Sequence, residues 1–207
     1  EIQQRFEEAV YAYNEAIEYA RGHVQDQPIY EIPAYSLAIA GKMSALLNCK
    51  RYDEIPALYA YLESIAEKLV AFSATRYAEV MMMAFQVMAE LYLHQGKLSE
   101  ALNLCKRSIN FAAGNDLQDE IAHLYYVMAR IALIQKKPEE AAAHMQKADD
   151  LLRLQPETVL VGLHYVNECK ALSEYGFTEQ AVIFHQRAQD IFEKWDANEC
   201  LALLEGE

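Results

Sequence analysis

The sequence predicts an all-α fold in which antiparallel helix pairs stack as a solenoid, an α–α superhelix. The first observation behind this prediction is a repeat. A small or apolar residue that follows a charged or polar pair recurs at positions 9, 55, 101, 141 and 181, so the spacing is 46 residues twice and then 40 residues twice. The second observation is composition, because good helix formers such as Ala, Leu, Glu and Lys dominate. The third is that no β-branched segment alternates with polar residues. We also expect the 7 Gly and 5 Pro to lie between helices.

The first elements are a lone helix and one repeat. Residues 1–22 are predicted to form an orphan second helix, and residues 30–72 a helix pair. In that pair Ile39 and Met43 share one helix face, and Ile55 opens the second apolar stripe after a turn.

The repeat at residues 75–113 has the clearest pattern. Phe85, Met88 and Tyr92 lie at i, i+3 and i+7, so they share one helix face. Gly96 then ends the first helix, and a second apolar stripe follows it.

The last elements are predicted by the same pattern. Residues 116–154 and 157–193 each form a pair, with Pro138 suited to the first turn of a helix and Gly176 to a helix end. Residues 195–207 are predicted to form a capping or linker helix. We expect the closest helix crossings at three pairs of small residues: Ala89 with Ala101, Ala129 with Ala141, and Cys169 with Ala181.

The segment Phe85-Gln-Val-Met-Ala-Glu-Leu-Tyr-Leu-His-Gln-Gly-Lys-Leu-Ser-Glu-Ala101 resembles the tetratricopeptide repeat (TPR) family. The family pattern is an aromatic residue, a Leu-small pair, a Tyr, a turn Gly and an Ala. The segments 125–148 and 165–188 also match, so the resemblance covers about residues 30–193. Spacings of 40 and 46 exceed the family's usual period of about 34 residues. Such long repeats are similar to those of bacterial regulatory TPR proteins, which implies a sensor or interaction domain in signalling or transcription regulation.

Charge and composition argue against several classes of partner. The net charge is −13 and no basic stripe occurs, which disfavours direct nucleic-acid binding. No apolar run is long enough to span a bilayer, so we expect no membrane association. The four cysteines form no C-x-x-C pair, which favours a reduced, cytoplasmic setting.

Signatures of chemistry are lacking as well. His164 and Cys169 have no further ligand at metal spacing, so we expect no metal. The sequence has no G-x-x-x-x-G-K, H-E-x-x-H, G-x-S-x-G or G-x-G-x-x-G motif. We therefore predict no catalytic residues, no cofactor and no enzymatic activity.

In the TPR family the first helix of each repeat lines a concave groove that binds ligand. The resemblance implies that Arg130 and Lys170, at equivalent positions in neighbouring repeats, meet a ligand carboxylate or backbone carbonyls. Glu90 holds the same place one repeat earlier, so the groove would run from negative to positive. The alternative is that these are ordinary solvated residues. The implied groove residues are Gln86, Glu90, His94, His123, Tyr126, Arg130, Asn167 and Lys170.

Two function classes remain open. The first is a regulatory module that binds a protein or peptide segment in its groove. The second is a structural scaffold or oligomerisation arm, with a homodimer as one form, that uses residues 195–207 and takes no small ligand. We expect the chain to be a fragment of a longer protein, since it begins inside a helical segment.

Overall fold

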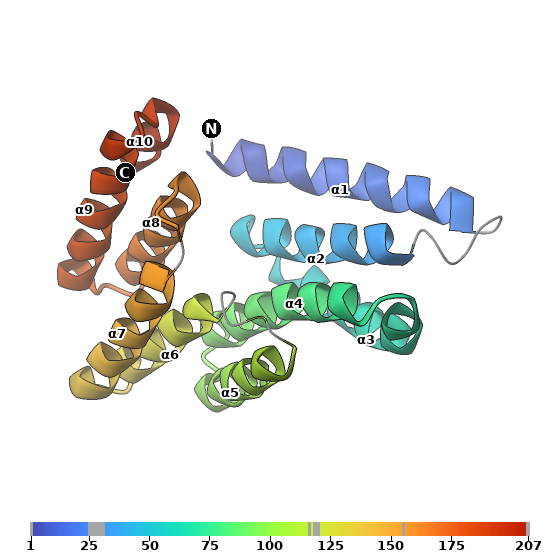
Figure 1. The fold of residues 1–207 in the computed structure, drawn as a ribbon, viewed down its shortest axis with the longest axis horizontal. Helices are drawn as coiled ribbons and strands as arrows, with labels where there is room; N and C mark the ends of the chain where they lie inside the picture. The colour runs from blue at the N-terminus through green and yellow to red at the C-terminus, as the bar shows by residue number, and fades with distance from the viewer. Residues whose placement is uncertain (1, 25–31, 116, 118–120, 155, 206–207) are drawn as a thin grey trace. The chain divides into compact units, whose positions relative to one another are not determined.

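The computed structural model describes residues 2–24, 32–115, 117, 121–154 and 156–205. In these residues every regular element is a helix, which confirms the all-α prediction (Figure 1). A 3-10 turn, η1 (Tyr52–Glu54), precedes α3. The α-helices are α1 (Ile2–Val24), α2 (Ile32–Asn48), α3 (Ile55–Phe72), α4 (Ala74–His94), α5 (Leu98–Gly114), α6 (Ala122–Ile134), α7 (Pro138–Leu154), α8 (Val159–Glu174), α9 (Thr178–Lys194) and α10 (Asn198–Glu205).

The chain divides into two compact units, residues 1–127 and 128–207, and the division falls inside α6. In the first unit α1 packs on α2, α2 on both α3 and α4, and α4 on both α3 and α5 (Figure 1). In the second unit α8 packs on α9, and α10 packs on both. Consecutive helices therefore pack against each other, as predicted for a helical repeat. That residues 1–207 act as one domain stays a prediction.

Five turns between helices share one backbone geometry, the Schellman motif. At the end of α4 the Gly96 N–H donates to the Leu93 carbonyl at 2.9 Å, and the Lys97 N–H donates to the Tyr92 carbonyl at 2.9 Å. These bonds satisfy carbonyls at the helix end and require a left-handed residue after it. The same pair of bonds recurs at every turn of this set, whose left-handed residues are Lys50, Gly96, Lys136, Gly176 and Asp196.

The left-handed turn at Gly96 gives a first stability prediction. Gly96→Ala is expected to lower the free energy of unfolding by about 1–2 kcal/mol, because a Cβ disfavours the positive φ of 70°. Apart from the two adjoining residues, no atom in the described part of the chain lies within 4 Å of the added Cβ, so the cost comes from the backbone alone. Urea denaturation followed by circular dichroism measures the change.

The matched control is Gly114→Ala at the end of α5. Among the described residues its Cβ would also meet nothing within 4 Å, and its φ is not in the left-handed range. It should leave stability unchanged or raise it by about 0.4–1 kcal/mol. Equal losses for the two variants would show that backbone strain is not the cause.

The small residues predicted at helix crossings lie in the core. Ala89, Ala101 and Ala129 are fully buried, and the other three members of the predicted pairs are at most 5% exposed.

The expectation that glycines and prolines lie between helices is wrong at several positions. Pro33, Pro56 and Pro138 lie in the first turns of α2, α3 and α7, and Gly22 lies in α1. Two further glycines inside helices are Gly41 in α2 and Gly162 in α8. An ideal Cβ at either one would lie 2.5 Å from a neighbouring aromatic ring, so close packing explains these glycines.

The described residues also bear on redox and metal chemistry. The four cysteines are free thiols: Cys49, Cys105 and Cys169 are buried, and Cys200 is half-buried. No cluster of His, Cys, Asp and Glu in the described part of the chain is arranged to hold a metal ion. Within the same part, no helix is long and apolar enough to cross a bilayer.

Candidate binding site

The eight predicted groove residues all lie on the first helices of repeats, but they differ in burial. Glu90, Tyr126 and Arg130 are buried, whereas His94 and Asn167 are exposed. The other three, Gln86, His123 and Lys170, are half-buried.

Within the first unit the structure brings two of these residues together. His123 Nε2 lies 3.0 Å from Glu90 Oε1, which joins the first turn of α6 to α4. Nearby, His94 stacks on Tyr52 of η1, with ring centroids 5.2 Å apart and an interplanar angle of 25°. These polar groups therefore contribute to helix packing.

In the second unit Arg130 is buried, whereas the predicted groove requires its side chain to face solvent. Its side chain is 1% exposed, and Nε lies 3.2 Å from Oε1 of Glu168, whose side chain is 2% exposed. A buried charge needs an opposite partner, and α8 supplies one here. Arg130 thus links α6 to α8. Because Glu90 and Arg130 are both buried, their charges do not line the predicted negative-to-positive groove. A ligand-binding role for the eight residues stays a prediction.

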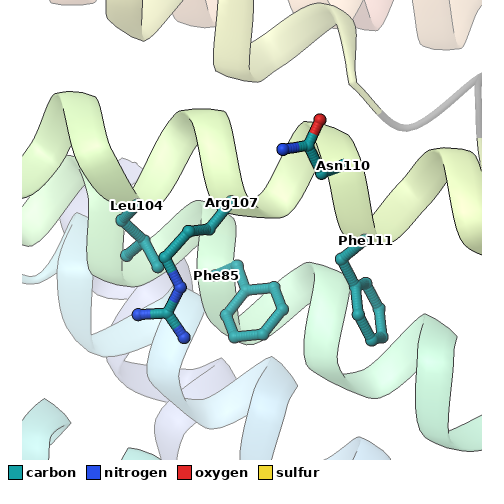
Figure 2. Close-up of a pocket in the computed structure, with 5 residues that line it drawn as sticks. All are labelled: Phe85, Leu104, Arg107, Asn110 and Phe111. Carbon is teal, nitrogen blue, oxygen red and sulfur yellow. The ribbon is translucent and has the colours of Figure 1, made fainter.

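A pocket lies elsewhere, between α4 and α5 of the first unit. It has a volume of about 280 Å³ and is lined by one residue of α4, Phe85, and four residues of α5. In Figure 2 the Arg107 guanidinium and the Phe111 ring lie on opposite sides of the Phe85 ring. The α5 residues are Leu104, Arg107, Asn110 and Phe111.

The pocket is bordered by a chain of aromatic contacts from three helices. The Phe85 and Phe111 rings meet edge to face, with centroids 5.4 Å apart and an interplanar angle of 89°. Tyr77 packs on Phe111 at 5.9 Å, and Tyr59 of α3 packs on Phe85 at 6.4 Å. Such edge and tilted packing is favourable for aromatic pairs, so the apolar wall is held in place.

Arg107 supplies the positive charge of the pocket. Among the described residues, no carboxylate is in ion-pair contact with it. Burial raises the pKa of the Tyr59 hydroxyl and the Glu63 carboxylate raises it further, whereas the nearby Arg107 charge acts in the opposite direction. Glu63 thus interacts with Tyr59.

The last repeat contains an arginine in the equivalent position with a different environment. Arg187 lies two periods of 40 residues after Arg107. Its Nη1 donates to both carboxylate oxygens of Asp149 at 2.8 Å, and its guanidinium lies over the rings of Tyr165 and Phe184 at 5.6 and 5.3 Å. A carboxylate of the protein therefore neutralises this arginine, whereas the described residues place none on Arg107.

This pocket was not predicted from the sequence, because Arg107 belongs to no basic stripe. A usable signal was present in the period. Arg107 and Arg187 are equivalent, and so are Phe85 and Tyr165, which places an arginine near an aromatic ring in both repeats. The 40-residue period could not indicate which of the two arginines, Arg107 or Arg187, has an acidic neighbour.

No protein-family model matches the sequence, and no curated protein matches it. Among solved structures, the chain is similar to the crystal structure of BtubC (BKLC) from P. vanneervenii, with a TM-score of 0.59 and 18% sequence identity. The similarity covers 96% of this chain and 81% of that one. At this identity the similarity supports the helical fold alone.

Proposed function

We propose that this chain is a non-enzymatic binding module that holds a protein or peptide segment in the pocket between α4 and α5. The observation that carries the proposal is the combination of an apolar wall, Phe85 and Phe111, with an arginine that has no carboxylate partner in the described residues. Ligand sites commonly pair apolar surface with a few polar groups that fix orientation.

A peptide is the ligand class that suits this pocket best. Its lining offers an apolar surface for a side chain, and Arg107 and Asn110 at exposed positions offer hydrogen bonds to a ligand. Stacked helical repeats typically work by binding on extended surfaces. The TPR resemblance agrees with this function, and the bacterial regulatory role and cytoplasmic location that we inferred from the sequence belong to the same proposal.

The test is to pan a phage-displayed random peptide library against the protein and measure affinities of the selected peptides by fluorescence anisotropy. Asn110→Trp places a large side chain at a lining position and is expected to weaken binding at least about tenfold, or about 1.4 kcal/mol. Asn103→Trp is the matched control, because Asn103 is also exposed on α5 and does not line the pocket.

Two results would contradict the proposal. The first is a library that yields no binder, and the second is a set of peptides whose affinities Asn110→Trp leaves unchanged. Peptides that instead depend on His94 or Asn167 would support the groove of first helices.

A scaffold role is the second candidate, favoured by exposed apolar side chains on and after α9. Val182 is 67% exposed, Ile183 53% and Trp195 53%. A chain that captures no peptide but forms dimers, which Val182→Ser with Ile183→Ser abolishes, would favour this role over peptide binding.

A further inference from the structure

We propose that the ligand of the α4–α5 pocket carries a carboxylate beside an apolar side chain, with the carboxylate bound by Arg107 and the apolar group packed against Phe85 and Phe111. This inference rests on the proposed function and adds the chemistry of the ligand.

The second unit shows how this type of arginine is satisfied. Arg187 Nη1 donates to each carboxylate oxygen of Asp149 at 2.8 Å, and the Asp149 side chain is only 7% exposed. The guanidinium at the same time covers the faces of two aromatic rings. An arginine at this repeat position therefore binds a carboxylate and an aromatic surface at the same time.

In the first unit the acid equivalent to Asp149 is Glu63, and it interacts with a tyrosine. Asp149 is eight residues after Ala141, and Glu63 is eight residues after Ile55, at the corresponding place in α3. Glu63 interacts with the Tyr59 hydroxyl, and no ion pair joins it to Arg107 within the described residues. None of the described residues therefore provides Arg107 with the carboxylate that Asp149 provides to Arg187, and the ligand would supply it.

The residues that line the pocket indicate that part of the ligand is apolar. Two phenylalanine rings and Leu104 line the pocket, so its lining is largely apolar. A volume of about 280 Å³ is at the lower limit of ligand pockets, which suits one side chain with its adjoining backbone. Burial of an aromatic side chain there supplies affinity, and the carboxylate supplies orientation.

Because the protein carries a net negative charge, an acidic ligand must be bound by close contact with Arg107. The net charge of −13 opposes any anion at long range, although salt screens that repulsion beyond about 10 Å. An acidic ligand is therefore selected by the local hydrogen bonds of the guanidinium, which fit a carboxylate in a bidentate manner.

Small probes that differ in one charge test the inference. N-acetyl-phenylalanine and N-acetyl-phenylalaninamide are titrated into the isotope-labelled full chain, and NMR shifts of Phe85 and Phe111 report binding. We expect the acid to bind about three- to tenfold more tightly than the amide, the range between an exposed ion pair and a hydrogen bond to a charged group. N-acetyl-aspartyl-phenylalaninamide, against its asparaginyl form, shows whether a side-chain carboxylate serves as well as a terminal one.

Arg107→Gln should abolish the preference for the acid and leave the affinity for the amide unchanged. Lys106→Gln is the matched control: it removes the same charge from the neighbouring exposed residue of α5, which does not line the pocket, and should keep the preference. Circular dichroism melting checks that both variants fold.

Three outcomes would overturn the inference: equal affinity of the acid and the amide, a preference that survives Arg107→Gln, and a lack of shifts at the two phenylalanines with every probe. Library peptides that bind and are lost with Asn110→Trp would still uphold the proposed function. The two proposals can therefore fail separately.

Discussion

Replacing Arg130 with methionine is expected to lower the free energy of unfolding by about 3–5 kcal/mol, the cost of leaving one member of a buried ion pair without its partner. Arg130 and Glu168 are 1% and 2% exposed, so water cannot take the place of the lost guanidinium. Urea denaturation followed by circular dichroism measures the loss.

A double variant separates the lost charge from lost packing. Positions 128 and 88, one and two periods of 40 residues before Glu168, are both methionine, so methionine suits this place in the repeat. Arg130→Met with Glu168→Met should recover most of the stability, because both members of the buried ion pair are then replaced together. Arg153→Met, at a side chain 67% exposed, should change stability by less than about 0.5 kcal/mol. A double variant as unstable as Arg130→Met alone would show that the ion pair is not the cause.

Gly162→Ala is expected to lower the free energy of unfolding by about 1–3 kcal/mol through overpacking between α8 and α9. The added Cβ would lie 2.5 Å from Cε1 of Phe192, which is 0% exposed and has no open space to enter. Thermal and urea unfolding measure the loss, and Phe192→Leu in the same chain should reduce it by making room.

Gly41→Ala is the control for the backbone effect, because it makes the same change inside α2. Its Cβ would lie 2.5 Å from the Tyr13 ring, which is half-buried at the side of α1 and can move outward. The gain in helix propensity of up to about 1 kcal/mol then offsets part of the strain. A loss at Gly41 larger than that at Gly162 would contradict this explanation.

The helical architecture could be predicted because local interactions determine it. Apolar spacing fixed the helix faces, and Gly96 and Gly176 indicated helix ends because a left-handed turn favours glycine. The turn at Lys136 has the same geometry without glycine, and there the position in the period predicted it. Pairing of neighbouring helices followed from short connections, which leave adjacent segments little choice of partner.

The candidate site could not be predicted to the same extent, because charge and burial depend on residues from other helices. By sequence alone Arg130 and Arg107 are both basic residues on helices, and the first was favoured as a ligand contact. In the structure Glu168 of α8 pairs with Arg130 in the core, whereas the described residues place no carboxylate on Arg107.

The sequence by itself therefore determined which segments are helices, where they turn and which faces are apolar, since these depend on contacts within a few residues. The tertiary structure decided which charges are neutralised inside the protein and which face a pocket. The free energy of a buried charge depends on a partner a few ångströms away in space, and that partner can lie tens of residues away in the chain, as Glu168 does from Arg130.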